Sequence, residues 1–445
     1  MTRVLFFLFV SLVPASGSPA TWFVSTTGRD DNAGTAAKPL ATITKASQLA
    51  KPGDVVIVRG GVYRGMVRIA SRGTQSAPIV FRSENAIIDG ARTPPNTNLV
   101  QLTEAEWVEF TGFEVRGATR IGISAWMSHH VTIAKNRVHD CGAAAIWAGG
   151  EKQGQTSDVT ITGNTVTGNV LQNAAHQLSR GWPQAIGVYK SARVAVTHNV
   201  VSRNHGEGIA IIVSNHCTVA DNEVNDNFSV EIYLDNAQST SVERNFVYSS
   251  GDRRYFRGGH PAFGIGAANE TYDVASPLEE ITIANNIILR TRSAIFYGNY
   301  ERGGGLRKSL IANNTCYAST EALVRIDESS RNEGTRVVNN IFYQSRQAPL
   351  ARAATRGVTF SHNNWNRADR SRVAGEGDVI GDPLFVNRGG TSAADYRIAA
   401  GSRAIDAGVH VPDLPSDYFG VRRDERYDAG AVEFTKRAAA SVATM

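Results

Sequence analysis

The chain has 445 residues, of which 42% are hydrophobic, and it carries 42 glycines and a formal net charge of +5. This composition supplies a large apolar core, while the abundant glycine and the few apolar heptads disfavour an all-α protein. The positive charge comes mainly from Arg, whose forked guanidinium suits carboxylate groups. Cys141, Cys217 and Cys316 are an odd number, so we interpret them as buried apolar residues, which excludes a disulfide framework or a cysteine metal site.

Residues 1–20 have the pattern of a secretory signal peptide. Arg3 precedes an apolar run over 4–13, and small residues follow it. The run is too short to span a bilayer, and no other run is long enough. We therefore expect an exported protein, extracellular or periplasmic, without a transmembrane segment.

Residues 21–66 are expected to form an N-terminal cap and the first coil. A short helix is expected over 42–50, ended by Pro-Gly, and a strand over 54–59. A helix at this place would cover the open end of a solenoid. The acidic residues of 30–32 are interpreted as a turn, with bound calcium as the alternative.

A repeated unit runs through residues 67–378. Asn199 recurs as Asn222 and Asn245, so two successive units are 23 residues long. Short β-branched runs that alternate with polar residues predict strands, and Asn and Gly at fixed offsets supply turns. Self-similarity at this period predicts an all-β solenoid, a parallel β-helix. Nine or ten coils at about 4.8 Å each would give a rod roughly 45 Å long.

The repeated asparagines are interpreted as structural. One Asn per coil at one turn can form a ladder in which side-chain amides bond along the stack. The signal recurs in every unit, which does not fit a single catalytic group. The series is Asn136, Asn164, Asn199, Asn222, Asn245, Asn286, Asn314, Asn340 and Asn364.

Strand alternation in the two 23-residue units predicts which side chains face outward. If Ile232 and Leu234 point into the core, then Glu231, Tyr233 and Asp235 point outward together. The aligned positions of the preceding coils carry mostly small residues, which predicts a groove that a polymer can enter.

Three further candidates for catalysis lie beside this strand. Lys190 falls just beyond a strand end, and His205 and Glu207 are expected in the turn before a strand. Their types suit acid–base chemistry, although polar turns commonly carry such residues without function.

Two insertions flank these coils and supply candidate substrate-binding residues. The steps that end at Asn199 and Asn286 are 35 and 41 residues, well above 23. Loops that leave a solenoid cluster on its binding face, aromatic rings stack on sugars, and Arg binds carboxylates. The candidates are His176, Arg180, Trp182, Tyr189, Arg253, Arg254, Arg257 and His260.

The C-terminal part departs from the repeat. Residues 379–434 are expected to form a capping module whose turns are held by Asp382, Asp406 and Asp428. Residues 435–445 are expected to be a disordered end.

Both ends of the chain carry strings that indicate a family. The opening has Gly28, Asp30, Asn32, Gly34, Thr35, Pro39, Thr42, Ile43, Ala46, Pro52, Gly53, Asp54, Val56, Val58, Gly61 and Tyr63. The tail has G-D-P-L-F over 381–385, A-G-S-R-A-I-D-A-G over 400–408 and D-A-G-A-V-E over 428–433. These strings resemble those of secreted bacterial right-handed parallel β-helix proteins of the pectin-lyase-like superfamily. The resemblance implies the fold, and it names no substrate because that superfamily holds lyases, epimerases, hydrolases and binding proteins.

The first candidate function is β-elimination or C5-epimerisation of an acidic, uronate-containing polysaccharide. A base removes the proton next to the carboxylate, and a cation must neutralise that carboxylate. Lys190, His205 or Tyr233 can be the base. Arg254 or Arg257 can neutralise, or calcium held by Glu231 and Asp235 can. We expect no organic cofactor and no nucleic-acid partner, and we expect a monomer.

Two alternatives remain open. In a glycoside hydrolase, Glu231, Asp235 and Glu207 would act as acid and base, although Glu231 and Asp235 are about 13 Å apart along one strand, too wide for a simple pair. A non-catalytic glycan-binding or surface protein needs only aromatic rings and Arg. An enzyme needs a base placed beside a cation within hydrogen-bond reach.

Overall fold

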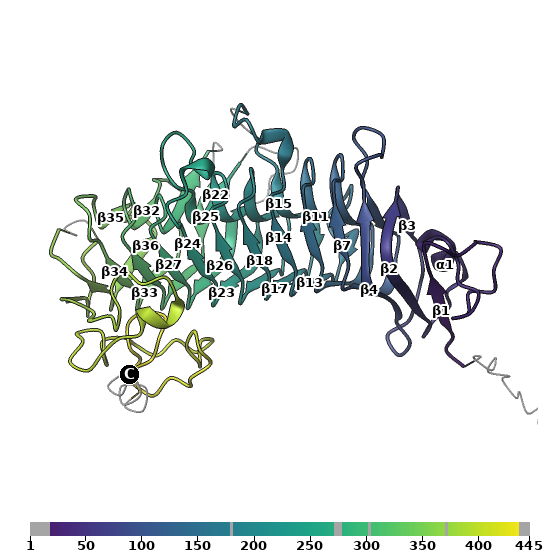
Figure 1. Cartoon of the computed structure of the whole chain (residues 1–445). Helices are drawn as coiled ribbons and strands as arrows, with labels where there is room; N and C mark the ends of the chain where they lie inside the picture. The colour runs from purple at the N-terminus through teal and green to yellow at the C-terminus, as the bar shows by residue number, and fades with distance from the viewer. Residues whose placement is uncertain (1–17, 179–180, 271–277, 301–303, 370–372, 436–445) are drawn as a thin grey trace, which may run out of the picture.

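The chain folds into one long parallel β-helix (Figure 1). The computed structural model describes residues 18–178, 181–270, 278–300, 304–369 and 373–435. Most of the expected signal peptide and the C-terminal end beyond 435 lie outside the described residues. Apart from one short helix and three 3-10 turns, the regular elements of the described part are strands, and every named strand pairs in parallel.

The strands form two sheets along the rod. The shorter sheet has eleven strands among the described residues, one per coil, where the sequence predicted nine or ten coils. The difference arises because the coils of β3 and β5 come before the first repeated Asn. The strands of this sheet are β3 (Val67–Ile69), β5 (Val100–Thr103), β8 (Ile121–Trp126), β11 (Ala144–Gly149), β15 (Gln184–Tyr189), β19 (Glu207–Ile212), β22 (Val230–Asp235), β25 (Phe263–Asn269), β28 (Ile295–Asn299), β32 (Val324–Ile326) and β35 (Ala351–Ala353).

The longer sheet has 27 strands in the described part and completes the wall of the solenoid. Its members are β1 (Thr21–Val24), β2 (Val55–Arg64), β4 (Ile79–Asp89), β6 (Glu106–Thr111), β7 (Glu114–Arg116), β9 (His129–Ala134), β10 (Arg137–His139), β12 (Thr156–Ser157), β13 (Thr160–Thr162), β14 (Thr165–Thr167), β16 (Ser191–Ala192), β17 (Ala195–Thr197), β18 (Val200–Ser202), β20 (Thr218–Ala220), β21 (Glu223–Asn225), β23 (Gln238–Glu243), β24 (Phe246–Tyr248), β26 (Leu278–Ala284), β27 (Ile287–Leu289), β29 (Leu306–Arg307), β30 (Leu310–Ala312), β31 (Thr315–Tyr317), β33 (Thr335–Val338), β34 (Ile341–Tyr343), β36 (Val358–Ser361), β37 (Asn364–Trp365) and β38 (Val379–Ile380).

The predicted helix, α1 (Ile43–Leu49), covers the first coil. The side chain of Thr42 caps its N-terminus by accepting from Lys45 N. Asp30 fixes the preceding loop, since its carboxylate accepts from Ala41 N, Thr42 N and the Thr42 hydroxyl. Asp30 therefore has the turn role that the sequence predicted.

The asparagine ladder is present, and its geometry explains the repeat. Asn222 Nδ2 donates to Asn245 Oδ1 at 3.0 Å and to Val196 O at 2.8 Å, and the same pattern joins successive coils. The residue before each ladder Asn has a positive φ, which turns the chain at that corner. These residues are Lys135, Gly163, His198, Asp221, Arg244, Asn285, Asn313, Asn339 and His362.

One member of the predicted ladder was wrong. Asn340 Nδ2 donates to Asn363 Oδ1 at 3.0 Å, so Asn363 continues the ladder and Asn364 does not. The left-handed residue at this corner is His362, with φ +54°, which places the ladder position immediately after it. The spacing from Asn340 is then 23, the same as in the regular units.

Aliphatic side chains fill the interior of the rod. Ile209, Ile232 and Leu234 are fully buried there, as alternation predicted. The three cysteines are also buried and free, as predicted. Burial raises the pKa of the Cys217 thiol to about 12, so this thiol stays protonated at neutral pH.

The C-terminal module packs along the flank of the late coils (Figure 1). Val411, Leu414 and Tyr427 form an apolar cluster with Ala284 and Val338 of the solenoid, among others. The docking uses the Asn residues that precede ladder positions in three consecutive coils.

These three docking asparagines bind the backbone of the module. Asn285 Nδ2 donates to Ser416 O, Asn313 Nδ2 to Asp428 O and Asn339 Nδ2 to Val409 O. An Asn-Asn pair in the sequence marks each of these three coils.

Candidate functional site

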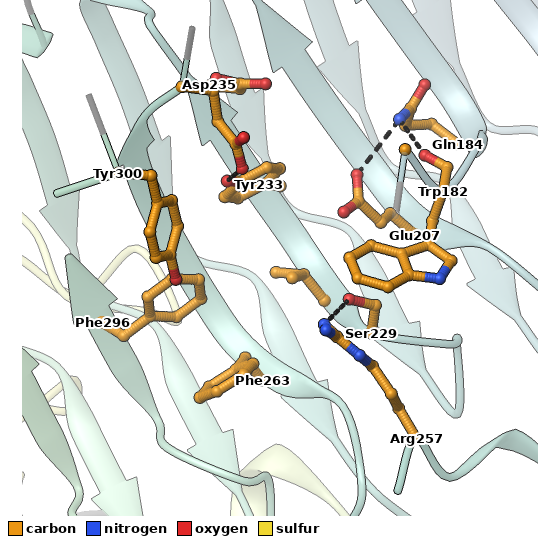
Figure 2. A pocket seen from close by; sticks show the side chains of 13 residues that line it. Trp182, Gln184, Glu207, Ser229, Tyr233, Asp235, Arg257, Phe263, Phe296 and Tyr300 are labelled. Carbon is orange, nitrogen blue, oxygen red and sulfur yellow. Dashed lines mark hydrogen bonds between the residues drawn. The ribbon is translucent and has the colours of Figure 1, made fainter. Parts of the chain in front are cut away.

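A cavity of about 350 Å³ lies on the outward face of the shorter sheet, across β15, β19, β22, β25 and β28 (Figure 2). This size suits a small part of a glycan chain. Two 3-10 turns, η1 (Leu171–Asn173) and η2 (Arg253–Tyr255), belong to the insertions that flank it. Its lining residues are Gly181, Trp182, Gln184, Glu207, Ser229, Val230, Tyr233, Asp235, Arg257, Phe263, Glu270, Phe296 and Tyr300.

Glu207 is a buried carboxyl group in this cavity. It begins β19 and is only 5% exposed, and Gln184 Nε2 donates to its Oε2 at 3.2 Å. Burial raises the pKa of Glu207 to about 8, and the negative charges of Asp235 and Glu270 add to the effect. Glu207 is therefore protonated at neutral pH and can donate a proton to a bound group.

Tyr233 lies at the centre of the acidic groups. Its hydroxyl donates to Glu270 Oε1 at 2.7 Å. Burial raises the pKa of Tyr233 well above its usual value, and Asp235, Glu270 and Glu207 raise it further. Tyr233 therefore keeps its proton at neutral pH and acts as a hydrogen-bond donor to the Glu270 carboxylate.

Arg257 forms the cationic side of the cavity. Its guanidinium carbon lies 3.7 Å from the centre of the Trp182 ring, and its Nη1 donates to Ser229 Oγ at 3.0 Å. Burial and the nearby Arg292 lower the pKa of Arg257. Stacking on Trp182 fixes the plane of the guanidinium. The N–H groups that do not bind Ser229 are therefore held in fixed directions.

Aromatic rings form the opposite wall. The ring centres of Phe263 and Phe296 are 4.5 Å apart, and Tyr233 stacks on Phe296 at 6.2 Å. Gly266 makes room for this wall, because a Cβ there would lie 2.2 Å from Phe296 Cε1. The cavity thus combines carboxyl groups, one guanidinium and apolar ring faces, which is a chemistry suited to sugars.

The predicted outward orientation of Glu231 was wrong. Glu231 is fully buried, and its carboxyl group accepts from Asn227 N and, at 2.6 Å, from Asn227 Nδ2. The position lies at the corner where alternation ends, and Gly208 occupies it in the preceding coil, where an added Cβ would lie 2.9 Å from Asn227 Nδ2 and 3.0 Å from the buried Val224 Cγ1. Glu231 therefore ends a second asparagine ladder, Asn169–Asn204–Asn227, inside the coil.

This geometry does not fit calcium held jointly by Glu231 and Asp235. Asp235 lines the cavity, whereas the Glu231 carboxyl group is engaged within the coil. Burial raises the pKa of Glu231 well above its usual value, and Asn227 donates to both carboxyl oxygens, so Glu231 is not placed as an ion ligand. Within the described ranges, no group of three or more His, Cys, Asp or Glu side chains could hold a metal ion.

The structure brings five predicted site residues together and separates the others. Glu207, Tyr233, Asp235, Trp182 and Arg257 line the cavity. Arg180 lies outside the described residues.

The remaining candidates lie elsewhere. Lys190 Nζ lies 5.0 Å from the Tyr189 ring, which lines a different cavity, so Lys190 is poorly placed as the base. Arg253 and Arg254 are exposed, and Arg254 pairs with Asp252 at 2.6 Å. His260 forms a tight turn with Arg257 through backbone hydrogen bonds.

His176 and His205 link the two insertions beside the cavity. Nε2 of His176 and Nδ1 of His205 are 3.2 Å apart, so one ring donates to the other and at least one is neutral. His176 also contacts Phe228, and His205 contacts Tyr255 of the second insertion. Burial lowers the pKa of both rings, and His176 lowers that of His205 further.

Acidification is expected to loosen this contact. At a pH above 6.5, the ordinary pKa of histidine, both rings are neutral in the folded and in the unfolded chain, so their protonation does not change the stability. At lower pH the rings of the unfolded chain gain protons more readily than the folded pair does, so the folded state is destabilised. Amide hydrogen exchange over 171–178 and 253–257, corrected for intrinsic rates, should show lower protection at about pH 5 than at about pH 7.5. His205→Phe keeps a ring but cannot titrate, so it should remove most of this difference; equal pH dependence in both proteins would contradict the assignment.

Sequence reasoning missed several residues of the cavity. Glu270 follows β25, and its place beside Asp235 depends on the pairing of Asp235 with Ala268. The 41-residue step hides that register, because it contains an insertion of unknown path. The repeat pattern predicts that Phe263 and Phe296 are core residues. The one sequence signal to the contrary is Gly266, whose missing side chain leaves space for the Phe296 ring.

Comparisons with known proteins agree with this fold. Residues 22–179 match a family model described as Pel9A-like, right handed beta helix region, and residues 155–254 match one described as periplasmic copper-binding protein (NosD). The uncharacterized protein YwoF of Bacillus subtilis (strain 168) is 26% identical over 339 residues, 68% of this chain and 69% of its own. Pectate lyase PEL9 of Emericella nidulans is 34% identical over 125 residues, 24% of this chain and 30% of its own.

Solved structures show the same architecture. XylC in complex with xylose superposes with a TM-score of 0.63 at 14% identity, covering 94% of this chain and 98% of XylC. Pectate lyase Pel9A gives a TM-score of 0.57 at 15% identity, covering 95% and 98%. An alginate lyase from Paenibacillus sp. str. FPU-7 gives 0.52 at 15% identity, covering 76% and 99%.

The three solved structures are named for a carbohydrate or for action on one, and they share the parallel coils described above, whereas the name of YwoF states no activity. None of the helices in the described part of the chain has the length and apolarity of a membrane span. The stacked coils, the asparagine ladder and the matches at both sequence and structure level lead to one conclusion: the chain is a right-handed parallel β-helix of the pectin-lyase-like superfamily.

Proposed function

We propose that this protein is an exported carbohydrate-active enzyme that hydrolyses glycosidic bonds in the cavity around Tyr233. The observation that carries the proposal is Glu207, a buried carboxyl group with a pKa raised to about 8, facing the carboxylates of Asp235 and Glu270 in one cavity. Glycoside hydrolysis uses such a pair: a protonated acid and an ionised carboxylate in different surroundings.

In this proposal Glu207 is the proton donor. It protonates the glycosidic oxygen as the bond to the anomeric carbon breaks, so the leaving sugar departs as an alcohol. Gln184, whose Nε2 donates to Glu207, holds the carboxyl group in place. As the glycosidic bond breaks, positive charge develops at the anomeric carbon of the other sugar, which becomes oxocarbenium-like.

Glu270 is the second carboxylate. The Tyr233 hydroxyl donates to it and fixes its direction, as expected for a group that faces a developing positive charge. Glu270 either attacks the anomeric carbon or takes a proton from the attacking water, and the separation of the carboxyl groups in the substrate complex selects between these routes. Asp235 adds negative charge to the same side.

The second candidate, β-elimination on a uronate polymer, is supported by Arg257 and by the names of the lyase relatives. Arg257 can neutralise a uronate carboxylate, and Glu207 can protonate the leaving oxygen. Three observations count against it. Tyr233 keeps its proton among three carboxyl groups, and Lys190 lies away from the cavity. The match to the Pel9A-like model also ends at residue 179, before the first residue that lines the cavity.

Export is part of the proposal. The pattern of residues 1–20 supports it, as does the match to a family model described as periplasmic.

The test uses a panel of neutral and uronate polysaccharides with two readouts, new reducing ends and the ultraviolet absorbance of unsaturated sugars. Hydrolysis gives reducing ends without absorbance, whereas elimination gives both. Glu270→Gln is expected to lower the hydrolytic rate by roughly 10²–10⁴-fold. Glu280→Gln, the same change at an exposed site on β26, should retain full activity. Reducing ends that persist in the Glu270→Gln protein would overturn the role of Glu270, and absorbance that accompanies them would establish elimination instead.

A further inference from the structure

A second cavity, of about 570 Å³, lies on the same outward face nearer the N-terminus. It is formed across β5, β8, β11 and β15, and its walls carry Trp126, Trp147 and Tyr189. All three rings are half-buried, so each keeps part of a face open to solvent. Polar side chains of Gln101, Thr103 and Ser124 complete the lining together with Asn98, Arg120 and Ile121.

Glycines in the neighbouring coils shape this cavity. Trp147 pairs in register with Gly187, and a Cβ at Gly187 would lie 2.4 Å from Cε3 and Cζ3 of the indole. A Cβ at Gly149 would lie 2.7 Å from Trp147 Nε1 and 3.4 Å from Trp126 Cζ3. The missing Cβ atoms let the indoles lie low over the sheet, so that they form a platform and not a row of upright rings.

The platform continues toward the first cavity. Along one column of the sheet Trp147, Gly187, Ala210 and Tyr233 pair in successive coils, so only small side chains occupy this column between Trp147 and Tyr233. Three coil steps at about 4.8 Å place Trp147 roughly 14 Å from Tyr233 along the rod. That distance is the span of a few linked sugars.

An apolar contact also joins the two places. Tyr189, which lines the second cavity, packs against the cluster that contains Tyr233, Phe263 and Phe296 of the first. Lys190 and Arg120 add positive charge at the edge of the platform: Lys190 Nζ lies 5.0 Å from the Tyr189 ring, and Arg120 is exposed.

We propose that the Trp126–Trp147–Tyr189 platform is a distal binding site for the polysaccharide whose scissile bond lies in the Tyr233 cavity. Sugar rings stack on the indole faces through their C–H groups, and the amide and hydroxyl side chains beside them bind sugar hydroxyls. The occupant is a chain and not a free monosaccharide, because the platform and the Tyr233 cavity lie on one continuous strip of the sheet. This inference rests on the proposed function for the position of the cleaved bond.

The test measures binding apart from cleavage. Native gels that contain xylan, a neutral polymer, or polygalacturonate, an acidic one, retard a protein in proportion to its affinity. In a Glu207→Gln background, which prevents turnover, Trp147→Ala is expected to weaken binding on the order of tenfold, the effect of losing one buried stacking contact. Trp107→Ala is the matched control, since Trp107 is a half-buried indole stacked on His130 on the longer sheet.

A second variant and a second readout keep the test sharp. Gly187→Ala keeps the Trp147 residue, but its Cβ would lie 2.4 Å from the indole and must displace the ring, so this variant should weaken binding without removing the indole. With active protein, Trp147→Ala should raise KM for the polymer and leave kcat/KM for a disaccharide unchanged.

If retardation depends on Trp147 but the unsubstituted protein cleaves none of the polymers, the platform is retained and the proposed hydrolysis is overturned. Equal binding and equal polymer KM in the Trp147→Ala, Trp107→Ala and unsubstituted proteins would overturn the platform and leave hydrolysis intact. Absence of retardation of the unsubstituted protein in both gels would also overturn the platform.

Discussion

Glu207→Gln is expected to lower kcat on the preferred glycan by roughly 10²–10⁴-fold, the usual contribution of a general acid. The amide keeps the size of the side chain and its contact with Gln184, but it has no proton to give to a leaving oxygen. KM should change little, since the side chain still fills the same space. Initial rates of reducing-end formation measure the effect, and Glu280→Gln is the control for an acid-to-amide change.

The pH profile gives an independent check on this role. With a pKa of about 8, Glu207 holds its proton at neutral pH and loses it in alkali, so activity should fall as pH rises through about 8. The alkaline limb should be absent from the residual activity of Glu207→Gln. A rate that is insensitive to this substitution, or an alkaline limb that survives it, would remove Glu207 from the proton-donor role.

The same group predicts how stability depends on pH. The folded protein keeps the Glu207 proton up to about 8, whereas the unfolded chain releases it near 4.5. The contribution of Glu207 to stability is therefore lost progressively as pH rises between those two values. Thermal unfolding of Glu207→Gln should be less sensitive to pH over this range than that of the unsubstituted protein.

Asn222→Ala is expected to lower the free energy of unfolding by about 3–6 kcal/mol, the sum of a few unsatisfied buried groups at about 1–3 kcal/mol each. Asn222 Oδ1 accepts from Asn199 N and Nδ2, and Asn222 Nδ2 donates to Val196 O and Asn245 Oδ1. Truncation removes the side-chain acceptor of the buried Asn199 N and the side-chain donor to Val196 O, whereas Asn245 Oδ1 keeps its bond from Asn222 N. Urea unfolding followed by circular dichroism measures the loss.

Asn364→Ala is the matched control for the ladder. Asn364 is as fully buried as Asn222, but its side chain only donates to Gly381 O, at 3.4 Å, and its Oδ1 has no hydrogen-bond partner among the described residues. Its truncation should cost less than about 1 kcal/mol, in line with one weak hydrogen bond. A loss as large as that of Asn222→Ala would contradict the assignment of Asn363 to the ladder.

The fold could be predicted because each coil repeats its own local signals. A β-branched run, a residue with left-handed backbone and an Asn recur at every corner, and the Asn acts on the next coil at the same position. The exception, Asn364 in place of Asn363, occurred where two asparagines are adjacent and spacing alone does not choose between them. The residue that does choose is His362, whose left-handed backbone holds the corner that His198 holds in an earlier coil.

The candidate site could be predicted only in part, because it depends on contacts between coils of unequal length. Tyr233 and Asp235 were found by alternation within one strand, whereas Glu231 was misplaced because alternation stops at the corner. Glu270 was missed because an insertion separates it from its neighbour Asp235 in the stack. The neutral state of Glu207 follows from burial by both insertions and from nearby charge, which no local pattern encodes.

The docking of the C-terminal module on Asn285, Asn313 and Asn339 sets an order for assembly of the chain. The contact of Asn285 with Ser416 spans 131 residues, and that of Asn339 with Val409 spans 70. Coils nearer the N-terminus depend only on adjacent coils, so they can stack as soon as they leave a ribosome or a translocation channel. The late coils bind the module through these asparagines, so their final state forms only after the chain has emerged almost completely. A truncation before residue 409 should therefore yield a rod that is ordered at its beginning and open to proteases at its end.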